Sequence, residues 1–295
     1  MVASSSDSRV ERTARRWTGD RRSARELREH YAIERGLARR LLHASSAERT
    51  ALYVDVYDEL FRRIPHHPQL RRRDSAERRA QVERELLLLA PLLSTESVFL
   101  ELGAGDLALS ARVARLGAEV HAVDVSVEIA GSRPGERVPN LHTHLTDGRE
   151  LSLTDACVDV AYSNQLMEHL HPDDAAAQLR EIVRVLRPGG AYLCVTPNRL
   201  SGPWDISRMF SATPTGLHLR EYTYGELTAL FARAGFDRCT ALLPLAGRAR
   251  RLRCTPLIAA EGALAALPSG VRRAAVRSPL GKPLNSVRLL ARKPG

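Results

Sequence analysis

The spacing of apolar and polar positions changes near residue 97, from a helical period to short apolar runs that alternate with helical stretches. Before this point apolar residues recur every three to four positions, as they do along one face of an amphipathic helix. This pattern predicts three helices: one over residues 24–44, one from the capping-box sequence Ser45–Glu48 to Pro65, and one that starts at Asp74–Glu77 and ends before Pro91. Residues 1–22 are polar and arginine-rich, which predicts a disordered tail. The front of the chain is therefore expected to be this tail followed by a helical cap over residues 23–93.

From Ser97 onward, short apolar runs alternate with helical stretches, a pattern typical of a parallel α/β sheet. Strands are predicted at residues 98–102, 119–123, 141–145, 158–163, 191–196, 236–243 and 287–292. The clearest helices between them are predicted at residues 107–116 and 172–186, and from the capping box at Thr223 to Gly235. A basic segment, residues 247–286, separates the last two strands, and we expect it to form a helical insert.

The stretch Val98–Asp106 begins with an apolar run that predicts a strand, and the strand ends in a turn that contains Gly103 and Gly105. Such a turn needs glycine because its backbone adopts conformations that a Cβ disfavours and passes close to a ligand. A Gly-x-Gly turn alone is a weak signal. However, Asp124 ends the next strand, where its carboxylate is suited to accept hydrogen bonds from ribose hydroxyls. The two features together predict a site for a nucleoside cofactor.

The acidic residues of this turn bear on which nucleoside is bound. Residues 103–108 also satisfy the looser dinucleotide pattern Gly-x-Gly-x-x-Ala. A pyrophosphate would then lie at the start of the following helix, close to Glu101 and Asp106, which would repel it. S-adenosylmethionine carries no phosphate, and its sulfonium and ammonium groups are compatible with carboxylates. The charges therefore favour the methyl donor over a nicotinamide cofactor.

Several motifs then occur in a consistent order: Glu101-x-Gly103-x-Gly105, Asp124, Asp147–Gly148, Ser163–Leu170 and Leu186–Gly190. In this combination the chain resembles the class I S-adenosylmethionine-dependent methyltransferases, and most of all the bacterial enzymes that methylate small molecules. The resemblance covers about residues 95–245 and the last strand. It implies a Rossmann-like, doubly wound seven-stranded sheet with an antiparallel last strand, and a methyltransferase domain over residues 94–295 that includes the basic insert.

The resemblance also implies roles for individual residues. Four of them would line the methionine portion of S-adenosyl-L-methionine: Glu101, Gly103, Ala104 and Gly105. Asp124 would bind the ribose and Val125 would flank the adenine. Asp147 would meet the adenine amino group, with Gly148 beside it, and Asn164 would lie near the transferred methyl group.

Methyl transfer to an oxygen acceptor, the commonest case, can also require a general base. His169 and His218 are the candidates, although a packing or structural role is the commoner one for histidines placed like these. Trp204 and Phe210 lie in the segment over residues 197–222, which we expect to close over a small-molecule acceptor together with the cap. No metal site is predicted.

Composition limits the alternatives. The four cysteines are scattered, which argues against a zinc site or a disulfide framework, and no signal peptide is apparent at the N-terminus, so a cytoplasmic protein is expected. The net charge of +10 suggests a nucleic-acid-associated methyltransferase. However, residues 91–246 hold 13 arginines against 19 acids, and this acidic core argues against that function. Residues 247–295 hold nine arginines and two lysines against one acid. The basic insert is either a lid or an element that contacts an anionic membrane or carrier, as in a methyltransferase of a lipid or lipid-linked sugar.

Overall fold

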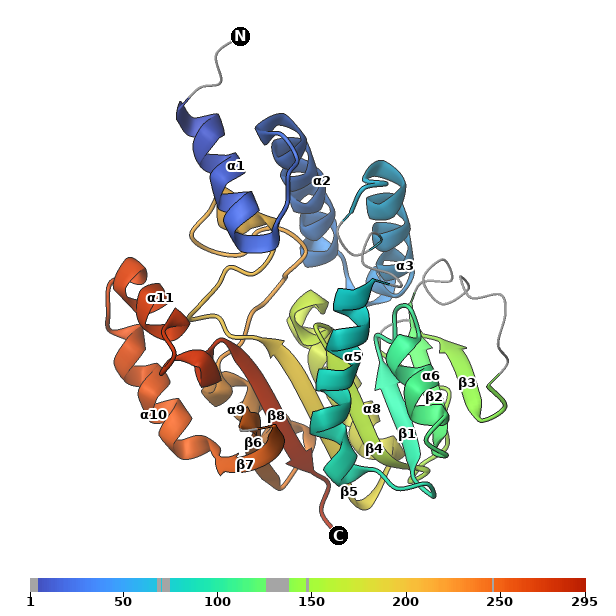
Figure 1. Cartoon of the computed structure of the whole chain (residues 1–295). Helices are drawn as coiled ribbons and strands as arrows, with labels where there is room; N and C mark the ends of the chain where they lie inside the picture. The colour runs from blue at the N-terminus through green and yellow to red at the C-terminus, as the bar shows by residue number, and fades with distance from the viewer. Residues whose placement is uncertain (1–4, 68–69, 71–74, 126–137, 147–148, 246) are drawn as a thin grey trace.

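A computed structural model describes residues 5–67, 70, 75–125, 138–146, 149–245 and 247–295, except for the side chains of residues 5, 17 and 18. Its centre is one sheet with the strand order β3-β2-β1-β4-β5-β8-β6-β7 (Figure 1). The strands are β1 Val98–Leu102, β2 Glu119–Asp124, β3 Leu141–Leu145, β4 Val158–Asn164, β5 Leu186–Pro197, β6 Arg238–Leu245, β7 Arg248–Arg253 and β8 Ser286–Arg292.

The strands β3, β2, β1, β4 and β5 pair in parallel. β8 pairs antiparallel with both β5 and β6, which confirms the predicted antiparallel last strand. The chain order reverses between β1 and β4, so the carboxyl ends of these two strands flank the crevice where ligands bind in open α/β sheets. The Rossmann-like, doubly wound fold class is confirmed.

The predicted number of strands, seven, is wrong: the described residues form an eight-stranded sheet. The additional strand, β7, comes from the segment predicted to be a helical insert, and it pairs antiparallel with β6. Gly247 lies in the turn between the two strands with φ +72°, a left-handed conformation that suits glycine. Arginine is a good helix former, so a run of arginines gave no strand signal. The rest of the insert is largely helical, in α10 Cys254–Ala265 and α11 Ser269–Arg277.

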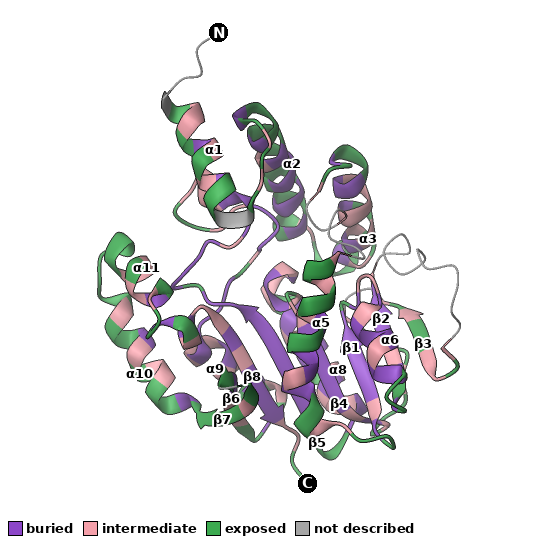
Figure 2. Ribbon diagram, in the orientation of Figure 1, coloured by how far each residue is buried: buried purple, intermediate pink, exposed green. Residues whose placement is uncertain are grey.

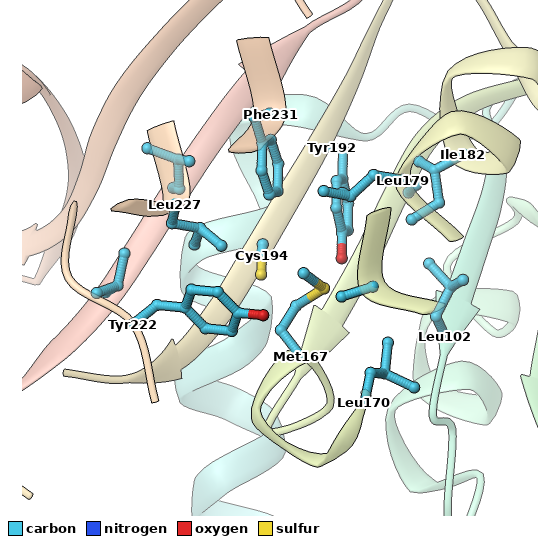
Figure 3. Packing of buried hydrophobic residues seen from close by; sticks show 14 of the residues in the cluster. Leu102, Met167, Leu170, Leu179, Ile182, Tyr192, Cys194, Tyr222, Leu227 and Phe231 are labelled. Carbon is cyan, nitrogen blue, oxygen red and sulfur yellow. The ribbon is translucent and has the colours of Figure 1, made fainter. Parts of the chain in front are cut away.

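Helices cover both faces of the sheet because successive strand residues point to opposite sides. Phe99 faces α5 (Ala76–Leu89) and α6 (Ala108–Ala114), whereas Leu100 belongs to the cluster on the opposite face, with α8 (Pro172–Val185) and α9 (Tyr224–Ala234). The central strands are largely buried between these layers, whereas the edge strands β3 and β7 are mostly exposed, as Figure 2 shows. On the α8–α9 face, Tyr192 of β5 stacks on Phe231 with ring centroids 5.3 Å apart (Figure 3).

Three helices form a cap beyond the carboxyl ends of the central strands: α1 Ser5–Thr18, α2 Ala24–His43 and α3 Ser46–Arg63 (Figure 1). The helix α5, which was expected to belong to the cap, packs on the sheet instead. The capping boxes predicted at Ser45 and Thr223 are both present. The predicted disordered tail is wrong for α1, in which Val10 and Ala14 are buried against Leu27 and the short helix η3 (Ile206–Met209). These two residues are one turn apart and form an apolar stripe too short to stand out among the surrounding arginines.

A buried ion pair fixes the cap to the sheet domain. Arg49 of α3 lies with Nε 2.5 Å from Oδ2 of Asp174, near the start of α8, and the two side chains are 3% and 1% exposed. Tyr53 Oη donates a hydrogen bond of 2.9 Å to the same carboxylate. The cap therefore has a defined position over the strand ends. Among the described helices, none is long and apolar enough to cross a membrane.

Candidate functional site

A cavity of about 570 Å³ lies between the cap and the carboxyl ends of the central strands. A smaller hollow of about 100 Å³ adjoins it, and both are lined by Tyr57, Gly103, Gly105, Gln165 and His169. The larger volume falls in the range of small-molecule sites, about 300–1,000 Å³. The two hollows thus form one elongated site at the point where the strand order reverses.

The glycine turn forms the floor of this site. Gly103 and Gly105 have φ values of +68° and +55°, so the turn uses the left-handed conformations for which glycine is suited. A Cβ on Gly103 would also lie 3.3 Å from Cδ1 of Leu166. Glu101 and Ala104 line the larger cavity beside the two glycines, so all four residues expected around the methionine portion lie together.

Asp124 and Val125 line the smaller hollow, together with Thr146 and Leu166. The carboxylate of Asp124 is buried, and its Oδ2 accepts a hydrogen bond of 2.8 Å from the backbone N–H of Gly105. One side chain therefore ties the end of β2 to the glycine turn. The other two residues expected near the adenine, Asp147 and Gly148, lie outside the described residues.

Three polar residues of α5 that were not predicted as site residues also line the larger cavity: Arg78, Gln81 and Glu85. Their spacing of three and four places them on one face of the helix, which is the signal that identifies them. Arg78 forms a two-point ion pair with Asp106, with N–O distances of 3.0 and 2.9 Å. Glu85 Oε1 accepts hydrogen bonds from Gln81 and, at 2.6 Å, from Nδ2 of Asn164. Asn164, expected near the transferred methyl group, is thus held at the end of β4 and lines the cavity.

These contacts revise the electrostatic argument about the turn. Asp106 is compensated by Arg78 and contributes less negative potential than the sequence suggests. Glu101 is buried and accepts a hydrogen bond of 2.5 Å from Ser110 Oγ. Burial raises the pKa of Glu101 to about 8, and the nearby charge of Glu85 acts in the same direction. Besides the pair of Arg78 and Asp106, this end of the cavity therefore presents two carboxyl groups, those of Glu101 and Glu85.

His169 lies at the junction of the two hollows, at the end of the short helix η2 (Met167–His169). Its Nδ1 is 3.0 Å from the carbonyl oxygen of Leu217. A carbonyl only accepts hydrogen bonds, so Nδ1 carries the proton and Nε2 keeps its lone pair. Burial, and then the charge of His218, lower the pKa of His169 to about 3. The imidazole is therefore neutral at physiological pH.

His218 has the opposite electrostatic environment. Burial disfavours its charged form, but the hydrogen bond of 2.9 Å to Glu221 and the charges of Glu168 and Asp205 outweigh burial and raise its pKa to about 9. At neutral pH both ring nitrogens carry protons, and the residue has no lone pair with which to accept another. This disfavours His218 as a general base.

Of the two aromatic residues expected in the acceptor wall, Trp204 lines the larger cavity. Phe210 does not: it stacks on Tyr31 of α2, with ring centroids 4.7 Å apart and an angle of 17° between the rings. The sequence gave no signal of this pairing, because Tyr31 and Phe210 lie far apart along the chain. In the structure it joins the segment after β5 to the cap.

Comparison with known proteins agrees with this geometry. Residues 100–194 match the family of methyltransferase domains. A probable S-adenosylmethionine-dependent methyltransferase of Mycobacterium tuberculosis is 36% identical over 148 residues, 50% of this chain and 51% of the relative. A second, of Mycolicibacterium smegmatis, is 41% identical over 101 residues, 34% of this chain and 37% of the relative. The chain thus spans about half the length, or less, of these curated relatives.

A solved structure shows the same fold. The Burkholderia thailandensis 1,6-didemethyltoxoflavin-N1-methyltransferase, determined with bound 1,6-didemethyltoxoflavin and S-adenosylhomocysteine, superposes with a TM-score of 0.51 at 20% identity, covering 85% of this chain and 92% of that one. The fold and the crevice define an open α/β domain with a ligand crevice at the carboxyl ends of its strands. Residues 100–194 therefore form a methyltransferase domain, and the curated relatives similar to this chain are probable S-adenosylmethionine-dependent methyltransferases.

Proposed function

We propose that this protein transfers a methyl group from S-adenosyl-L-methionine to an oxygen atom of a small-molecule acceptor bound beneath the cap. The observation that carries the proposal is the shared lining of the two hollows. The smaller one holds Asp124 and Val125, the larger one lies under the cap, and His169 lines both. A donor bound along the strand ends would therefore meet an acceptor from the cap side beside His169.

The residues present suit the cofactor at both of its ends. Asp124 would accept hydrogen bonds from the ribose and Val125 would flank the adenine, with Asp147 and Gly148 proposed from the sequence alone. At the other end, Arg78 is a partner for the carboxylate of the methionine portion, and Glu85 is a partner for its ammonium group. A combined cation and anion at one end suits the zwitterionic end of S-adenosylmethionine, which a nicotinamide dinucleotide lacks.

The donor supplies a methyl group on a positively charged sulfur, and the carbon–sulfur bond breaks as a lone pair of the acceptor forms the new bond. His169 Nε2 then takes the proton that the acceptor hydroxyl loses. A hydroxyl oxygen becomes strongly acidic as it is alkylated, so a weakly basic imidazole is sufficient for this step. The cap and the glycine turn hold the two reactants aligned, which supplies much of the acceleration. His218 remains protonated and stabilises the loop that carries it.

Calorimetric titration tests the cofactor. S-adenosylmethionine and S-adenosylhomocysteine should bind, and Asp124→Asn should weaken binding about 10-fold or more because it removes the charged acceptor. The exposed Asp173→Asn variant is the matched control and should bind as the wild type does. Binding of NADH without binding of S-adenosylmethionine would refute the proposal.

The pH dependence of turnover separates the two histidines. With an acceptor found by screening hydroxyl compounds against methyl-labelled cofactor, kcat should be flat between about pH 6 and pH 8, because His169 is already in its basic form. If His218 were the base, kcat would instead rise about tenfold per pH unit toward pH 9. His169→Gln should lower kcat about 100-fold or more and leave the cofactor affinity close to the wild-type value.

We also propose that the basic segment, residues 247–286, contacts an anionic membrane surface, which makes a lipid or lipid-linked sugar the alternative acceptor. The only acid after residue 247 is Glu261, which is buried and accepts hydrogen bonds from the backbone N–H groups of Tyr224 and Gly225. Every exposed side-chain charge of this segment is therefore positive, including the four arginines of β7. Sedimentation with vesicles should increase with their anionic lipid content. Sedimentation that does not depend on this content would argue for a simple lid.

A further inference from the structure

A chain of hydrogen bonds connects the cap to His169. Arg22, which precedes α2, lies with Nη1 2.9 Å from Nδ1 of His30. A guanidinium only donates hydrogen bonds, so His30 Nδ1 accepts and Nε2 carries the proton. That proton is donated to Oε1 of Glu34, 2.7 Å away. Glu34, buried on α2, thus keeps its second oxygen for another donor.

The second oxygen of Glu34 reaches the loop that holds His169. Oε2 accepts a hydrogen bond of 3.1 Å from the backbone N–H of Leu217. The carbonyl oxygen of the same residue accepts the 3.0 Å hydrogen bond from His169 Nδ1. The backbone of Leu217 is therefore held on one side by the cap and holds the imidazole on the other.

We propose that Glu34 is a positioning residue for the reaction proposed above, because it fixes the Leu217 carbonyl that selects the tautomer and orientation of His169. The inference rests on the proposed function of His169 as the proton acceptor. Without this carbonyl, the neutral ring can place its proton on Nε2 instead of Nδ1. The cavity-facing nitrogen would then donate a hydrogen bond to the acceptor hydroxyl instead of receiving its proton.

The loop around Leu217 depends on such contacts because it forms no helix or strand between η3 and α9. Gly216 donates its backbone N–H to Asp205 at 2.9 Å, directly before the bond from Leu217 to Glu34. A Cβ on Gly216 would lie 2.5 Å from Glu34 Oε2 and 2.6 Å from Asp205 Oδ2. Glycine at this position therefore lets two carboxylates approach consecutive N–H groups.

A competing explanation is that Glu34 holds a metal ion. The ligand atoms of His30, Glu34 and His67 lie within 4.8 Å of one another. However, the proton that Arg22 imposes on His30 Nε2 occupies the position that a metal ion would need. The same proton explains why His30 Nε2 and Glu34 Oε1 are in direct hydrogen-bond contact. The geometry therefore favours the hydrogen-bonded chain.

The test combines two variants of Glu34 with a control on the same helix. Glu34→Ala removes both acceptor oxygens, and Glu34→Met removes them while keeping a side chain of similar length in case the smaller residue prevents folding. Tyr31→Phe removes a different bond between α2 and the loop, from Tyr31 Oη to Thr215 Oγ1 at 2.8 Å, and leaves Leu217 untouched. Nitrogen-15 NMR of the imidazole rings reports the tautomer of His169 without any need for turnover.

We expect wild type and Tyr31→Phe to show His169 with its proton on Nδ1. The Glu34 variants should show a mixture of tautomers and a kcat lower by about 10- to 100-fold, with unchanged affinity for S-adenosylmethionine. A wild-type His169 spectrum in a folded Glu34 variant would overturn this inference. Full turnover in His169→Gln would instead refute the proposed role of His169, so the two failures are distinguishable.

Discussion

Glu101→Gln is expected to stabilise the protein without its cofactor. The carboxyl group lies buried under the glycine turn, where burial and the nearby charge of Glu85 raise its pKa from 4.5 to about 8. In the unfolded chain the same group ionises at its ordinary pKa. Folding near neutral pH must therefore keep a proton on Glu101 that the unfolded chain releases, and this costs free energy.

The size of the effect follows from the two pKa values. A group whose pKa is raised on folding contributes stability that is fully present below pH 4.5 and is lost as the pH rises toward about 8. At pH 7 the loss extends over about 2.5 pH units, each equivalent to about 1.4 kcal/mol, so the cost is about 3 kcal/mol. Glutamine is neutral at every pH, so the variant does not incur this cost on folding. The variant should therefore exceed the wild type by up to about 3 kcal/mol at pH 7.

Urea unfolding of both proteins, without cofactor, between about pH 4.5 and pH 9 provides the measurement. The difference in unfolding free energy should be small at the acidic end, grow steadily, and level off above about pH 8. The exposed Glu96→Gln variant is the control and should track the wild type. A difference that does not change with pH would refute the reasoning, because only a group titrating differently in the two states produces this curve.

Three further variants test parts of the fold and the site. Arg49→Met should lower the unfolding free energy, measured in urea, by about 3 kcal/mol because it leaves Asp174 without its principal buried cation. The control Arg187→Met, at an exposed ion pair, should lower it by less than about 1 kcal/mol. Equal losses in the two variants would contradict this account. Thr223→Ala should lower stability by about 1 kcal/mol by removing the N-cap of α9, and an unchanged unfolding midpoint would argue against it. Gly103→Ala should weaken S-adenosylmethionine binding measured by calorimetry, since the turn adopts a left-handed conformation there; wild-type affinity would show that the turn tolerates a side chain.

Local sequence features predicted much of the fold. The capping boxes at Ser45 and Thr223 located two helix starts because the contact lies within four residues. The pair of Gly105 and Asp124 was identifiable because each ends a strand-forming run, and the structure joins them by a hydrogen bond.

Other features depend on contacts between distant segments. The ion pair of Arg78 with Asp106 joins α5 to the turn before α6, and nothing near Arg78 in the sequence indicates its partner. The charge of His218 depends on Glu221, which is close in sequence, but also on Glu168, which lies on the separate short helix η2. Protonation states and cavity walls of this kind follow from the assembled fold and not from spacing along the chain.

The position of the cap divides the site between two stretches of sequence. Groups proposed for the methyl donor come mainly from residues 78–125, whereas the wall under which the acceptor would bind is built largely from residues 20–70 and 204–218. Changes in acceptor preference can therefore accumulate in the cap and its partner loop without altering donor chemistry. The buried contact of Arg49 with Asp174 would hold such a changed cap in the same position relative to the sheet. Within the cap and its loop, Glu34 and Leu217 are the exceptions, because they hold His169 in the arrangement proposed above.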